Sequence, residues 1–182
     1  NAAGKVVKEV AVKEIKYGNA HLHMRAARKN KQCEYGIVSS GEMRVLILNP
    51  DGTTKRIIDL QKLPKHIEHE YSHGFAFLDN GNILASTSYG SCFVELDADD
   101  KIVWSLTPQD LPELNLKYAS GMQRLANGNT ICTAHKSKYP VFEVTPDNEI
   151  VWKMPASKEI GEILHVQVIN NSDKPSEFEL QK

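Results

Sequence analysis

The stretch Ser72-His73-Gly74-Phe75-Ala76-Phe77-Leu78-Asp79-Asn80-Gly81-Asn82-Ile83-Leu84-Ala85 decides the fold. It has the pattern of two strands joined by a tight turn, because Asn-Gly between two apolar runs is a strong hairpin signal. The pattern returns at 120–132, with Asn127-Gly128-Asn129 as its turn. Two more strand-like runs follow each copy, at 93–97 and 101–104 and again at 141–145 and 149–152. The sequence therefore predicts a repeated unit of four antiparallel strands.

The repeat extends to both sides of these two copies. A complete unit is predicted at 21–60, with its first turn at 29–32, and the first strands of a further unit at 165–182. In the three complete units the first strand begins seven residues before a turn asparagine, at His23, His73 and Ser120. His165 is the corresponding start of the further unit. A fixed spacing inside the unit, with linkers of variable length, is typical of stacked repeats.

Four-stranded units at a period of 45–50 residues predict an all-β fold, a β-propeller of antiparallel blades. One small sheet cannot bury both of its faces, whereas blades packed around an axis can. We expect residues 1–182 to be one propeller domain or part of one. Residues 1–20 would hold the last strand of a preceding blade and a linker, and full blades would occupy 21–60, 73–106 and 120–154. Two alternatives stay open: part of a larger propeller, or a four-bladed ring that the N-terminal strand at 5–11 closes.

Composition narrows the classes of partner. The net charge of −1 and the pI near 6.7 argue against a nucleic-acid-binding protein, which normally carries a basic excess. No apolar run reaches the ~20 residues that a membrane-spanning helix needs. A small molecule or a protein is therefore the expected partner. Three cysteines, Cys33, Cys92 and Cys132, are expected to be small buried residues in strands.

Two segments resemble the tryptophan-bearing motif of pyrroloquinoline-quinone-type propeller repeats: Leu96-Asp97-Ala98-Asp99-Asp100-Lys101-Ile102-Val103-Trp104 and Glu143-Val144-Thr145-Pro146-Asp147-Asn148-Glu149-Ile150-Val151-Trp152. His73 followed by Asn80-Gly81-Asn82-Ile83-Leu84 resembles the repeats of arylsulfotransferase-like propellers. The resemblance implies a propeller fold and a secreted or periplasmic location. The sequence departs from the motif where Lys8 and Arg56 replace its tryptophan. It also lacks a recognisable set of quinone or calcium ligands, so no cofactor is predicted.

Equivalent first-strand residues of radial blades converge at one mouth of the central channel. The predicted ligand-binding residues at these starts are His23, His73 and His165. Tyr71 and Tyr118 lie two residues before His73 and Ser120 and are added to the site, and the resemblance to arylsulfotransferases implies Arg25 and Arg124 as further ligand-binding residues. Histidines there could ligate a metal when neutral, bind an anion when protonated, or exchange protons near pH 7. The competing interpretation is a structural hydrogen bond from each histidine to a neighbouring blade. No metal site is predicted, and Trp104 and Trp152, which share one blade position, are expected to pack between blades.

These residues predict a noncatalytic propeller that binds a small ligand or a protein partner at the channel mouth. The alternative is an enzyme that resembles arylsulfotransferases. In that case the channel histidines would handle a sulfuryl or other anionic group, with Arg25 and Arg124 as clamps on the anion. The sequence leaves open whether the protein is an enzyme.

Overall fold

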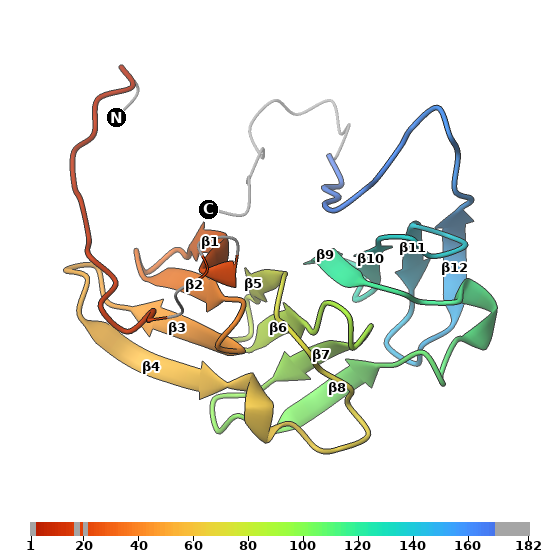
Figure 1. Cartoon of the computed structure of the whole chain (residues 1–182), viewed down its shortest axis with the longest axis horizontal. Helices are drawn as coiled ribbons and strands as arrows, with labels where there is room; N and C mark the ends of the chain where they lie inside the picture. The colour runs from red at the N-terminus through yellow and green to blue at the C-terminus, as the bar shows by residue number, and fades with distance from the viewer. Residues whose placement is uncertain (1–2, 17–18, 20–21, 170–182) are drawn as a thin grey trace.

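The computed structural model describes residues 3–16, 19 and 22–169. It contains three four-stranded antiparallel sheets, each with its strands in chain order (Figure 1). The first sheet holds β1 (Met24–Lys29), β2 (Tyr35–Ser39), β3 (Arg44–Leu48) and β4 (Thr54–Asp59). The second holds β5 (Phe75–Phe77), β6 (Ile83–Ser86), β7 (Phe93–Leu96) and β8 (Ile102–Leu106). The third holds β9 (Ala119–Arg124), β10 (Thr130–Ala134), β11 (Val141–Val144) and β12 (Ile150–Met154).

The sheets stand side by side in an arc, with their first strands on its inner side (Figure 1). β1 contacts β5, and β5 contacts β9. Two short 3-10 helices, η2 (Leu60–Lys62) and η3 (Pro112–Leu114), lie in the linkers that follow the first and second sheets. No described helix has the length and apolarity to cross a membrane. The predicted all-β propeller architecture is confirmed.

Two apolar cores lie between the three sheets. Alternate residues of the second sheet face opposite ways, so Ile83 and Val94 join the core shared with the first sheet, while Leu84 and Phe93 join the core shared with the third. The rings of Phe93 and Phe142 meet edge to face across the second core, with centroids 6.3 Å apart. Each fully buried side chain of this size stabilises the fold by about 1.5–3 kcal/mol. The middle sheet is thus apolar on both faces.

The turn between the first two strands fixes how the blades correspond. Leu78 N–H donates to the Asn82 carbonyl and Gly81 N–H to the Leu78 carbonyl, and the third sheet repeats both bonds from Leu125 and Gly128. In the first sheet the same two bonds are made by Asn30 N–H to Glu34 and by Cys33 N–H to Asn30. Asn30 therefore corresponds to Leu78 and not to Asn80.

The predicted register of the first blade is consequently wrong by two residues. Arg25 takes the place of His73, and His23 takes the place of Tyr71. The sequence does not reveal this shift, because the left-handed position of the turn is occupied by Cys33 (φ 63°) where the second blade has Gly81 (φ 87°). A glycine would have marked that position. Cys33 is also exposed, contrary to expectation, whereas Cys92 and Cys132 are buried as predicted. Burial raises the pKa of the Cys92 thiol to about 11.

The described ends of the chain carry no strand, although strands were predicted at 5–11 and from 165. Residues 3–16 lie on the outer face of the first sheet, where Val10, Val12 and Ile15 pack against Ile37, Leu46 and Leu48. Within the described residues, no strand pairs with the backbone of this segment, so it adds no strand to the first sheet. The rest of the predicted fourth unit, 170–182, lies outside the described residues.

The segment that follows the third sheet nevertheless lies against it. The Leu164 carbonyl accepts hydrogen bonds from Gly121 N–H (2.9 Å) and Thr133 Oγ1 (2.9 Å). The Ser120 carbonyl accepts from Ser86 Oγ (2.7 Å) in the same way at the preceding boundary. Leu164 thus holds, against the third sheet, the place that Ser120 holds against the second.

Candidate functional site

The candidate site lies at the rim where the chain enters each blade. In an antiparallel sheet of four sequential strands, the entry to the first strand and the turn between the second and third strands lie at the same end of the strands. Ala119 N–H accordingly bonds to the Ser88 carbonyl (2.8 Å), and His135 N–H bonds to the Tyr118 carbonyl (2.9 Å). The linkers and the second turns of neighbouring blades therefore form one continuous rim.

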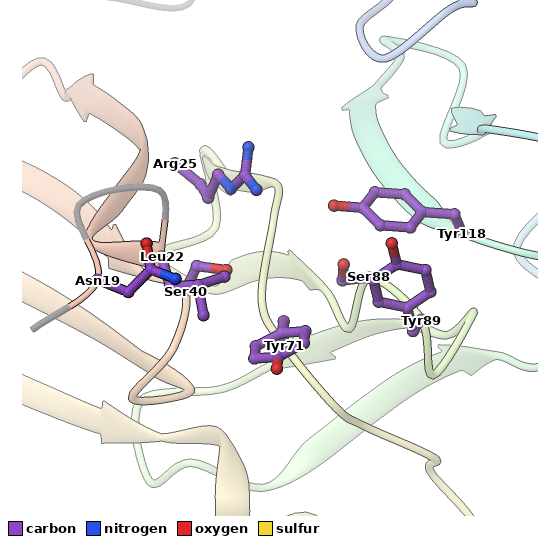
Figure 2. A pocket seen from close by; sticks show the side chains of 8 residues that line it. All are labelled: Asn19, Leu22, Arg25, Ser40, Tyr71, Ser88, Tyr89 and Tyr118. Carbon is purple, nitrogen blue, oxygen red and sulfur yellow. The ribbon is translucent and has the colours of Figure 1, made fainter. Parts of the chain in front are cut away.

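A cavity of about 210 Å³ opens at this rim, between the first two sheets and the start of β9. Figure 2 shows the eight residues that line it: Asn19, Leu22, Arg25, Ser40, Tyr71, Ser88, Tyr89 and Tyr118. The Tyr71 and Tyr89 rings have centroids 6.3 Å apart, and those of Tyr89 and Tyr118 lie 4.8 Å apart, both edge to face. Arg25 is the one lining residue that carries a full charge. The cavity thus combines one cation, an aromatic wall and several hydroxyl groups.

His73 lies beside this wall and is almost fully buried, with 4% of its surface exposed. Its ring centroid is 5.5 Å from that of Tyr118 and 5.5 Å from that of His165. Its Nδ1 atom is buried and has no hydrogen-bond partner among the described residues. A buried nitrogen without a partner costs free energy, so such groups are uncommon in folded proteins.

Electrostatics keep this histidine pair neutral. Burial lowers the pKa of His73 to about 4, with further contributions from repulsion by Arg25 and by the protonated forms of His165 and His135. Burial and the charge of Arg28 also lower the pKa of His165. A neutral imidazole offers one donor and one acceptor but no charge. An anion at this rim would therefore be attracted by the arginines and not by the histidines.

The structure brings together five of the seven predicted site residues: His73, His165, Arg25, Tyr71 and Tyr118. His23 precedes β1, and its carbonyl accepts from Ser40 N–H (2.9 Å), but it is not among the residues that line the cavity. Within the described chain, no three His, Cys, Asp or Glu side chains are grouped closely enough to hold a metal ion.

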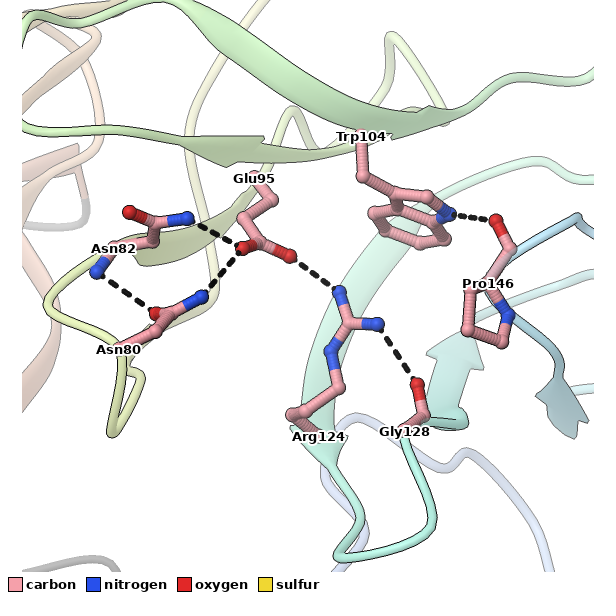
Figure 3. A network of polar contacts seen from close by, with 7 residues as sticks. All are labelled: Asn80, Asn82, Glu95, Trp104, Arg124, Gly128 and Pro146. Atoms are coloured by element: carbon pink, nitrogen blue, oxygen red, sulfur yellow. Dashed lines mark hydrogen bonds and ion pairs between the residues drawn. The ribbon is translucent and has the colours of Figure 1, made fainter.

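Arg124 lies elsewhere, at the opposite end of β9 (Figure 3). Its guanidinium pairs with Glu95 of the second sheet (2.6 Å), donates to the Gly128 carbonyl (2.9 Å), and lies 5.1 Å from the centroid of the Trp104 ring. The expectation that Arg124 clamps an anion at the mouth is thus corrected. Ser120 and Arg124 share a face of the strand, but the four residue-to-residue steps between them span roughly 13 Å, so Arg124 lies at the far end from the cavity.

Trp104 belongs to the same contact. Its Nε1–H donates to the Pro146 carbonyl of the third sheet (3.1 Å), which confirms that this tryptophan packs between blades. Asn80 and Asn82 hold the other carboxylate oxygen of Glu95, at 3.3 and 2.7 Å (Figure 3). This network fastens two blades and has no part in the cavity.

Sequence reasoning missed the residues that the second turns contribute. Ser40, Ser88 and Tyr89 line the cavity, and the His135 ring lies 5.9 Å from that of Tyr118. One signal was available: in a four-stranded blade, the turn between the second and third strands lies at the same rim as the entry to the first. Tyr89, with 55% of its surface exposed, is the large apolar residue of its turn.

The comparisons concern the fold. No protein-family model matches the chain, and no similar sequence was found among curated proteins. A Bacteroides caccae protein of unknown function superposes with a TM-score of 0.67 at 22% identity, covering 80% of this chain and 54% of that one. The WD40 β-propeller domain of Doa1 gives a TM-score of 0.59 at 9% identity, covering 79% and 44%. Virginiamycin B lyase from Staphylococcus aureus gives 0.56 at 14% identity, covering 78% and 44%.

The chain spans about half the length of these structures, or less. At such identities the similarity shows a shared fold and no shared activity. The structural neighbours include β-propellers, and this chain has the fold of consecutive propeller blades.

Proposed function

We propose that this propeller domain is a noncatalytic binding module that takes a small anionic ligand at the channel mouth. The observation that carries the proposal is the cavity whose single charged lining residue is Arg25. A guanidinium presents several donors in a planar fork that fits carboxylate, sulfate or phosphate. The tyrosines supply flat apolar surface together with hydroxyl groups, so the ligand would carry a ring or another planar body beside its anionic group.

The size of the cavity restricts the ligand. At about 210 Å³ it is smaller than the roughly 300–1,000 Å³ of pockets that enclose drug-sized molecules. A molecule with one ring and one anionic group matches this volume. A protein partner would engage the same rim through an exposed acidic side chain or a C-terminal carboxylate.

The neutral histidine pair supports a second candidate, an enzyme of the kind that the resemblance to arylsulfotransferases implies. His73 has a buried Nδ1 atom without a described partner, and that atom could accept a proton. However, a general base works best when its pKa lies near the working pH, and the pKa of His73 is about 4. Binding without catalysis is therefore the function that the geometry favours.

The test is calorimetric titration of the chain with benzoate and benzylamine, two rings of similar size and opposite charge, each at pH 7. We expect benzoate to bind and Arg25→Met to weaken that binding at least tenfold. Binding of both molecules with equal affinity would contradict the proposal. Incubation with 4-nitrophenyl sulfate, followed by the absorbance of released nitrophenol, tests the enzymatic alternative.

A further inference from the structure

A hydrogen bond from the fourth strand of one blade to the next blade recurs at the boundaries between the three sheets. Ile47, Glu95 and Glu143 on the third strands face Arg56, Trp104 and Trp152 on the fourth strands, so these three fourth-strand residues are equivalent. Arg56 donates to the Asp97 carbonyl of the second sheet (2.8 Å). Trp104 donates to the Pro146 carbonyl of the third sheet (3.1 Å). In both cases the donor reaches the backbone of the turn between the third and fourth strands of the next blade.

The N-terminal segment makes this contact too. Lys8, which aligns with Arg56 and Trp104, donates through Nζ to the Pro50 carbonyl in the corresponding turn of the first sheet. Val10 packs closely against Gly52, because a Cβ added to Gly52 would lie only 2.7 Å from a methyl carbon of Val10. The contact is therefore made three times along the chain, by Arg56, by Trp104 and by Lys8. The segment that holds Lys8 pairs with no described strand.

The third sheet presents the same donor without an acceptor. Trp152 is 47% exposed, and its Nε1–H has no partner within the described residues. Beside it, Glu143 accepts from Asn129 Nδ2 at 2.7 Å, as Glu95 accepts from Asn82. Glu95 is also paired with Arg124, whereas no described cation pairs with Glu143.

We propose that the outer face of the third sheet, defined by Glu143 and Trp152, docks a further four-stranded blade. The turn between the third and fourth strands of that blade would offer a backbone carbonyl to Trp152. The segment at Leu164 would supply its first strand, because the Leu164 carbonyl accepts from Thr133 Oγ1 as the Ser120 carbonyl accepts from Ser86 Oγ at the preceding boundary. The chain covers 44% of the solved WD40 β-propeller domain of Doa1, so that propeller extends beyond the matched part.

The experiment supplies that blade from the chain's own repeat. Because Leu164 corresponds to Ser120, residues 1–169 are followed by a copy of residues 126–154, which brings a second Pro146 carbonyl. Trp104 and the copied tryptophan are replaced by phenylalanine, so that Trp152 is the sole tryptophan and can be excited selectively at 295 nm or longer. The matched control carries a Gly/Ser segment of the same length in place of the copy. Trp104 in a Trp152→Phe version of the original chain gives the value for a docked tryptophan.

We expect acrylamide quenching of Trp152 to fall in the extended chain to the level of the docked Trp104, with emission at shorter wavelength. The Gly/Ser control should keep the strong quenching of an exposed ring. Equal quenching of Trp152 in the extended chain and in the control overturns the proposal. Equal quenching counts against the proposal even if circular dichroism shows that the appended repeat has not folded. A face that docks a blade should order the repeat that is placed beside it.

Discussion

Replacement of Arg124 by methionine tests whether this residue joins blades or binds ligand. The change keeps the apolar stem but removes the guanidinium that pairs with Glu95, whose side chain is only 9% exposed. Removing one partner of a buried ion pair costs about 3–5 kcal/mol, and the 20% exposure of Arg124 places this pair near the lower end. Loss of the contact with the Trp104 ring adds about 0.5–1 kcal/mol. We therefore expect a loss of roughly 3–4 kcal/mol in the free energy of unfolding.

Urea unfolding, followed by tryptophan fluorescence and by circular dichroism, measures this loss. The double variant Glu95→Gln, Arg124→Met removes the stranded carboxylate and should recover on the order of 1–2 kcal/mol of it. Ligand affinity at the mouth should stay unchanged in the folded variant. A loss below about 1 kcal/mol, or a loss of ligand binding at unchanged stability, would refute the structural role given to Arg124.

Three further predictions concern single positions. Cys33→Gly should raise the free energy of unfolding by roughly 0.5–1 kcal/mol in urea titrations, because φ of 63° strains a non-glycine residue; no gain would contradict the turn geometry. Gly74→Ala should lower the melting temperature by several degrees, since its Cβ would lie 2.0 Å from the Ser120 carbonyl oxygen; an unchanged melting temperature would argue against this close approach. The lowered pKa of His73, about 4 against an unfolded value near 6.5, means that only the unfolded chain takes up this proton between those pH values. Stability should therefore fall by up to about 3 kcal/mol as pH drops from 6.5 to 4, and His73→Gln should remove that part of the slope.

The sequence was sufficient for the fold because its signals are local. The Asn-Gly turns at 80–81 and 127–128 set the hairpins, and alternating apolar residues set which faces are buried. The first blade was misaligned because Asn30 looks like a turn asparagine, whereas the residue with positive φ is Cys33. Only hydrogen bonds along the turn reveal that shift.

The site was partly predictable for a related reason. His73, Tyr71 and Tyr118 were found because their distance from the turn is fixed within a unit. Arg124 was misplaced because strand periodicity gives the face of a residue but not the rim that it reaches. Tyr89 was missed because its role depends on the second turn of a blade meeting the linker of the next, which is a matter of tertiary packing.

In the proposed function, Arg25 provides the charge that holds a ligand at the channel mouth. The most direct measurement is the affinity for benzoate, by calorimetry at pH 7, of the unaltered chain, Arg25→Met and the matched control Arg44→Met, an arginine on β3 that does not line the cavity. We predict at least a tenfold weaker affinity for Arg25→Met and an unchanged one for Arg44→Met, with all three chains folded by circular dichroism. Equal weakening in both variants, or in neither, would contradict this role of Arg25.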